Sequence, residues 1–150
     1  MKKHDKALQY ANNGIKILVE EIEELTEKEN NYIEEQTERN RDSQGDSNIH
    51  EEQTEEEKKI IVVKREKLSL LAIAYYNAGS QLEFLKQYKE WIEHFNQAIS
   101  VLERNFKEDY PLTLEFKKTL SKAIQKYQVH VSWKGSKRTF SNLNESFVTK

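Results

Sequence analysis

Apolar side chains recur at helical spacing over most of this chain, and this periodicity constrains the fold more than any other feature. Steps of three and four residues place side chains on one face of an α-helix. Such steps connect the apolar residues within 8–25, 68–85, 88–102 and 112–127. The 150 residues include only four glycines and one proline, which also favours long helices. The sequence therefore predicts an all-α fold.

Two short segments indicate where one helix ends and the next begins. Lys86-Gln87 separates two apolar stretches, so we expect a new helix to begin at Tyr88. Asp109-Tyr110 precedes Pro111, and proline disfavours helix at the residue before it but suits the first position of a new helix. The sequence therefore predicts an antiparallel helical hairpin and a following helix over residues 59–128.

Residues 35–58 interrupt the helical pattern. This segment holds one aliphatic residue, Ile49, and no aromatic residue. A segment of this composition cannot bury enough apolar surface to offset the entropy of ordering it. We expect an acidic disordered insert or a charged loop, whose glutamate-rich ends could extend the neighbouring helices. It would separate an amphipathic helix over 1–34 from the helices of 59–128.

Charge is strongly segregated along the chain, although the net charge is only −2. Residues 20–66 carry seventeen acidic and seven basic side chains, whereas residues 117–150 carry eight basic and one acidic. The acidic middle and the basic end could attract each other, or each could meet an outside partner.

Residues 72–105 resemble one tetratricopeptide repeat, a helix–turn–helix unit of about 34 residues. If Ala98 takes the small position late in the second helix, Gly79 falls on the small position that lets the first helix approach it. Large residues then fill the gap around them. Trp91 departs from the pattern, because the family usually has alanine there, and we expect it to widen the hairpin or reach a neighbouring helix. The resemblance implies packing roles for Tyr75, Ala78, Gly79, Leu82, Trp91, Phe95 and Ala98.

The flanking segments are similar to kinesin-light-chain-type repeats. Residues 107–123 look like a linker and the first helix of a following repeat, and residues 6–18 look like the second helix of a preceding one. A generic helical bundle or a coiled-coil hairpin would also place small residues where helices touch. Because about three repeats are normally needed for stability, the chain could be a fragment or a subunit completed by its neighbours.

No spacing predicts a catalytic, metal or cofactor site. The chain has no cysteine, no Gly-rich phosphate loop and no nucleophile elbow. Its histidines stand singly, without the pairing typical of zinc or di-iron sites; they are His4, His50, His94 and His130. We therefore expect a protein that is not an enzyme and uses no cofactor.

Aromatic residues cluster between residues 75 and 95. We expect Tyr75, Trp91 and Phe95 to lie in the core. Tyr76, Phe84 and Tyr88 could instead line a concave face that grips an extended peptide or another helix.

The basic segment 129–150 combines positive charge with aromatic residues. It could fold on an acidic surface through Trp133, Lys137, Arg138 and Phe140, and residues 138–141 have the spacing of a kinase acceptor site. It could equally be a disordered tail or an arm that packs on the chain's own helices. A nucleic-acid partner is disfavoured, because the whole chain is mildly acidic.

The sequence as a whole predicts a non-catalytic scaffold that binds protein partners. The alternative is a structural subunit of a large cytoskeletal or ciliary assembly. No stretch has the roughly 20 apolar residues of a membrane span or the apolar core of a secretory signal, so we expect a cytoplasmic protein.

Overall fold

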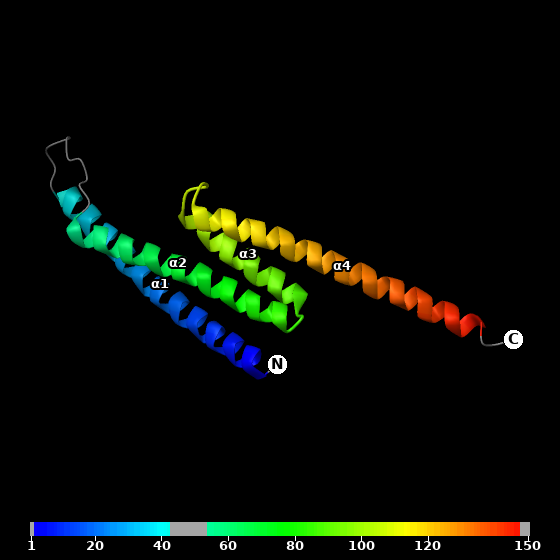
Figure 1. Cartoon of the computed structure of the whole chain (residues 1–150). Coiled ribbons are helices and arrows are strands. Elements are labelled where there is room, and N and C mark those ends of the chain that lie inside the picture. Colours follow the sequence, from blue (N-terminus) through cyan, green and yellow to red (C-terminus); the bar gives the residue numbers. More distant parts are fainter. Residues whose placement is uncertain (1, 43–53, 148–150) are drawn as a thin grey trace.

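The chain forms an array of antiparallel helices. The computed structural model describes residues 2–42 and 54–147, with the side chains of 2–38 and 54–132. Within them the helices are α1 (Lys2–Asp42), α2 (Glu55–Phe84), α3 (Tyr88–Asn105) and α4 (Pro111–Phe147), and there is no strand. Each helix packs against the one before it, so α1 and α4 form the two ends of the array (Figure 1). The predicted all-α class is confirmed.

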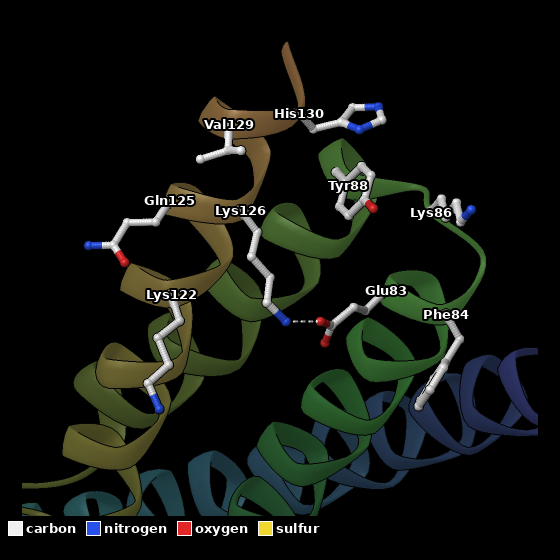
Figure 2. Close-up of a pocket in the computed structure, with 9 residues that line it drawn as sticks. All are labelled: Glu83, Phe84, Lys86, Tyr88, Lys122, Gln125, Lys126, Val129 and His130. Atoms are coloured by element: carbon white, nitrogen blue, oxygen red, sulfur yellow. Dashed lines mark hydrogen bonds and ion pairs between the residues drawn. The ribbon is translucent and has the colours of Figure 1, made fainter. Parts of the chain in front are cut away.

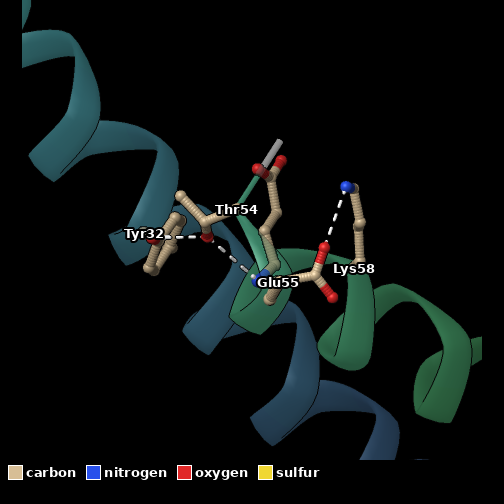
Figure 3. A network of polar contacts seen from close by, with 5 residues as sticks. Tyr32, Thr54, Glu55 and Lys58 are labelled. Carbon is tan, nitrogen blue, oxygen red and sulfur yellow. Dashed lines mark hydrogen bonds and ion pairs between the residues drawn. The ribbon is translucent and has the colours of Figure 1, made fainter. Parts of the chain in front are cut away.

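The first two helices extend into the segment predicted to be an insert. Residues 35–42 belong to α1 and residues 55–58 to α2, whereas residues 43–53 lie outside the described part. The Thr54 side chain caps α2 by accepting a hydrogen bond from the Glu57 backbone N–H at 3.4 Å. Its hydroxyl is also 2.6 Å from that of Tyr32 in α1 (Figure 3). Polar contacts therefore set this end of α2, where the apolar pattern gives no signal.

The turn between α2 and α3 is closed by backbone hydrogen bonds. The Lys86 N–H donates to the Glu83 carbonyl and the Gln87 N–H to the Leu82 carbonyl, each at 3.0 Å, in the pattern of a Schellman motif. This motif places Lys86 in the left-handed region, with φ 61°. Helix α3 then begins at Tyr88, and α4 begins at Pro111, as the sequence predicts.

The core lies between α2, α3 and α4. One buried cluster contains Ala72, Ile99 and Phe116, and a second contains Leu82, Phe95 and Ala123, each group with members from all three helices. Tyr76 of α2 joins the clusters. Its ring stacks on Phe95 with centroids 5.1 Å apart and on Phe116 with centroids 4.5 Å apart.

Helix α1 packs on α2 more loosely. Its apolar stripe is only half-buried. Ion pairs fix its register, with Glu29 2.6 Å from Lys64 and Glu21 2.8 Å from Lys67. At its other end, His4 Nδ1 lies 2.9 Å from the Gln81 side-chain oxygen. The stripe residues are Leu8, Ala11, Ile15, Leu18, Ile22 and Leu25.

Helix α4 continues far beyond Tyr127, the last residue of the apolar pattern that predicted this helix. We expected residues 129–150 to form a separate tail, but the backbone is helical through Phe147. No proline follows Pro111, so no residue that lacks a backbone N–H interrupts the helix, even where no inward-facing apolar pattern supports it. His130 contacts Tyr88 at the start of α3, and Figure 1 shows the rest of α4 projecting past this point.

Candidate functional site

The predicted repeat-packing residues come together at the interface of α2 and α3. Six of them are buried, and Tyr75 is half-buried with its ring edge toward His94, at a centroid distance of 6.1 Å. Gly79 of α2 lies directly against the Phe95 ring of α3. The close approach that the sequence predicts at this glycine is therefore present. The six buried residues are Ala78, Gly79, Leu82, Trp91, Phe95 and Ala98.

Trp91 reaches the neighbouring helix α4. It is 2% exposed and packs edge-on against Phe95, with Lys126 of α4 5.5 Å from the centre of its ring. A lysine ammonium over an indole face is attracted by the ring's electron density. The bulky residue at a usually small position therefore helps to hold α4 against α3.

A pocket of about 1100 Å³ opens where α2 ends and α4 passes it (Figure 2). The end of α2 supplies Glu83 and Phe84, the turn supplies Lys86, and α3 supplies its first residue, Tyr88. The opposite wall belongs to α4, which continues far enough along α3 to face this end of α2 (Figure 2). The α4 residues that line the pocket are Lys122, Gln125, Lys126, Val129 and His130.

The pocket carries an excess of positive charge. Glu83 is its single acidic lining residue, and it forms an ion pair with Lys126 across the pocket (Figure 2). Lys86 and Lys122 form no ion pair with any described residue, so their charges face the opening uncompensated. The apolar contribution comes from Phe84, which is 65% exposed, together with Tyr88 and Val129.

The structure divides the three aromatic residues predicted to line a concave face. Phe84 and Tyr88 line the pocket. Tyr76 does not, because its ring is packed between Phe95 and Phe116. The other predicted partner-binding residues lie in the distal part of α4, where the backbone is described and the side chains are not; they are Trp133, Lys137, Arg138 and Phe140.

Sequence reasoning missed the α4 wall of the pocket. Lys122 and Lys126 are spaced by four residues, and Val129 follows three later, so one face of a helix at this place carries both charge and apolar surface. That spacing is the sequence signal that could have indicated the α4 wall. These α4 residues form a pocket wall only because α4 lies beside the end of α2. The α2 residues that they face, Glu83 and Phe84, are more than 35 residues away in sequence.

The described histidines make ring contacts and hydrogen bonds. His94 Nδ1 lies 2.9 Å from the Glu90 carbonyl oxygen, His4 contacts the Gln81 amide, and His130 packs against the Tyr88 ring. Among the described residues, no group of three or more potential metal ligands comes together. No helix in this part of the chain has both the length and the apolar character of a membrane span.

Comparison with known proteins adds no relative. No protein-family model matches the chain, and no match was found among the curated proteins or the solved structures.

Proposed function

We propose that this chain is a non-catalytic scaffold, in which helical hairpins of tetratricopeptide type hold a segment of another protein in the pocket between α2 and α4. The observation that carries the proposal is the pocket itself. It combines Phe84, which is 65% exposed and stacks on the His4 ring, with two lysines, Lys86 and Lys122, that form no ion pair with a described residue.

The size and the lining of the pocket favour a protein segment. Pockets for small ligands measure about 300–1000 Å³ and enclose most of the ligand. This pocket is about 1100 Å³ and lies on the surface between two helices, so it can take several side chains of an extended peptide or one face of a helix. Exposed aromatic residues commonly anchor such partners, because they bury a large area at little entropic cost.

The charge of the pocket favours an acidic partner segment. Lys86 and Lys122 would attract carboxylates and orient them at the rim, while Phe84 and Val129 offer apolar contact. The ion pair between Glu83 and Lys126 keeps the sole lining carboxylate from repelling such a segment.

Selection from a random peptide library displayed on phage tests this function with the intact chain. We expect enriched peptides that carry Asp or Glu near an aromatic or aliphatic residue. Their binding should weaken by about tenfold or more in Phe84→Ala or Lys122→Glu, since truncating an anchor residue costs 1–2 kcal/mol or more. The matched controls are Tyr10→Ala and Lys89→Glu, exposed positions outside the pocket. Failure to enrich any peptide, or equal binding to all variants, would refute the proposal.

A second function is favoured by the projecting half of α4. A helix that runs to Phe147, beyond the start of α3, offers a long surface to a neighbouring subunit (Figure 1). This fits a structural subunit of a cytoskeletal or ciliary assembly. Thermal unfolding followed by circular dichroism separates the two candidates. A scaffold should unfold in one cooperative transition, whereas an assembly subunit alone should be partly unfolded at the outset.

A further inference from the structure

Exposed apolar side chains recur at multiples of seven residues on the first two helices. They are Tyr10 and Ile17 on α1, and Val63, Leu70 and Phe84 on α2, each between 40% and 74% exposed. Seven residues make almost two turns of helix, so side chains at this spacing line up along one side of each helix. Helices α1 and α2 therefore each carry a row of apolar side chains that the described residues leave uncovered.

The two rows lie on the same side of the α1–α2 pair. Gly79 of α2 contacts Phe95 of α3, and Asn77, in line with the α2 row, is about 200° from Gly79 around the helix. Leu8 of α1 packs against the buried cluster that contains Phe95, and Tyr10 is about 200° from Leu8 around α1. Both rows therefore face away from α3. We name this surface the α1–α2 face; its exposed members at seven-residue spacing are Lys3, Tyr10, Ile17, Glu24, Val63, Leu70, Asn77 and Phe84.

Polar contacts fix how the two rows lie along the helices. Helices α1 and α2 run antiparallel and side by side (Figure 1). His4 of α1 lies 2.9 Å from Gln81 of α2, and Glu21 lies 2.8 Å from Lys67. In this register the middle of the α1 row lies level with the middle of the α2 row.

We infer that the α1–α2 face binds the same face of a second copy of this chain, so that the two hairpins form a four-helix contact. A two-fold axis that crosses both helices at their common level makes every row match its own copy in reverse order. Each contact then occurs twice, as in any symmetric dimer of this kind. The residues that this axis brings together are Lys3 with Glu24, Tyr10 with Ile17, Val63 with Phe84, and Leu70 with Asn77.

Charge favours this arrangement. Lys3 and Glu24 are exposed and form no ion pair with a described residue, and the axis places each opposite the other. At the edge of the face, Lys6 and Glu20 are matched in the same way to within one residue. A two-fold axis along the helices would instead leave Lys3 level with Lys3 of the second copy. Opposite charges therefore select the axis that crosses the helices.

The size of the face suits a stable dimer. From residue 3 to residue 24, α1 rises about 32 Å, and two packed helices are about 20 Å wide. The contact would cover about 600 Å² on each copy, or about 1,200 Å² in total, which reaches the range of specific interfaces. Its apolar middle and charged ends also match the usual layout of a hydrophobic centre within a polar rim.

This contact is closed, because each copy uses its whole face and association stops at the dimer. It does not depend on the proposed function, since Phe84 is the only member of the face that also lines the pocket. A segment that covers the Phe84 ring would displace only the contact with Val63 at the end of the face. The test below leaves Phe84 unaltered.

Sedimentation velocity of the full chain over a concentration series tests the inference. We expect the 17.8 kDa chain to form dimers and no larger species. Ile17→Asn with Leu70→Asn should weaken dimerisation by about tenfold or more, because it removes apolar surface from the middle of the contact. The matched control is Leu114→Asn with Val131→Asn, which alters exposed apolar residues of α4 and should leave dimerisation unchanged.

An exchange of charges tests which residues meet. Lys3→Glu alone and Glu24→Lys alone should each weaken dimerisation by about tenfold, because like charges then face each other across the axis. The two changes together restore opposite charges and should recover the dimer. Circular dichroism checks that every variant folds. The inference is overturned if the unaltered chain stays monomeric, if the Ile17 and Leu70 variant dimerises normally, or if the double charge exchange fails to recover the dimer.

Discussion

The Cβ atom that Gly79 lacks would lie 2.9 Å from Cε1 of Phe95. Real Cβ atoms essentially never approach that closely, so α2 and α3 touch at a position that accepts hydrogen alone. His94 Cβ, 3.4 Å from the same point, closes a second side of the space.

We therefore expect Gly79→Leu to lower the free energy of unfolding by about 1–3 kcal/mol, the range typical of overpacking. Urea unfolding followed by circular dichroism measures it. Gly14→Ala is the matched control, because a Cβ there meets nothing within 4 Å. In α1 that change should stabilise the chain by up to about 1 kcal/mol through helix propensity. An unchanged urea midpoint for Gly79→Leu would contradict the packing of α2 on α3.

The Thr54 cap should contribute measurably to stability. Thr54→Ala removes the hydrogen bond from the Glu57 N–H and the contact with the Tyr32 hydroxyl, and we expect a loss of about 1 kcal/mol. Tyr32→Phe leaves the cap in place and removes the contact between the hydroxyls and the hydrogen bond that the Gln36 side-chain amide donates to Tyr32 at 3.3 Å, so it should cost less. Thermal unfolding of both variants shows which of the two loses more stability. A larger loss for Tyr32→Phe would show that the cap is not the dominant contact.

Thr113 buries a hydroxyl that has no hydrogen-bond partner among the described residues, and the residue is 1% exposed. Valine has nearly the same shape and no polar group to desolvate. We expect Thr113→Val to raise the free energy of unfolding by about 1 kcal/mol. In Thr119→Val the lost hydroxyl is hydrogen-bonded to the Glu115 carbonyl at 3.1 Å, so no comparable gain should follow. Differential scanning calorimetry compares the two, and a lower Tm for Thr113→Val would count against this account.

Lys86 holds a left-handed backbone conformation that glycine adopts without steric cost. We expect Lys86→Gly to stabilise the chain by up to about 1 kcal/mol, because it removes strain at the end of α2. Lys118→Gly, inside α4, should instead cost about 1 kcal/mol. Chemical denaturation of both variants checks the opposite signs. Two losses of equal size would argue against the left-handed turn.

Local signals in the sequence predicted much of the hairpin. The starts of α3 and α4 followed from Lys86-Gln87 and from Pro111, and the close approach at Gly79 was expected from the resemblance to a tetratricopeptide repeat. The helix starts depend on residues within one or two turns of helix. The far end of α4 was not predictable in this way, because a helix without an inward apolar stripe leaves no periodic signal.

The residues of the pocket were likewise predictable only in part. Phe84 and Tyr88, which the aromatic-rich sequence indicated as possible lining of a concave face, do line the pocket. Tyr76 has the same chemistry and spacing, yet it lies between two rings from other helices. Lys126 likewise becomes part of the site only through its ion pair with Glu83 of α2. Such roles depend on how α4 lies beside α2, which residue spacing along one helix does not encode.

Helix α1 is packed less tightly than the other helices, so we expect it to separate from the chain at a lower free energy than the core unfolds. The buried clusters belong to α2, α3 and α4, while α1 is held by a half-buried stripe and by pairs such as Glu29 with Lys64. The α1 side of that seam holds no fully buried side chain, whereas separating α3 from its neighbours would expose the buried clusters. Amide protons of α1 should therefore exchange with deuterium through a partial opening that leaves the other three helices protected. The chain can thus release one helix and keep its core.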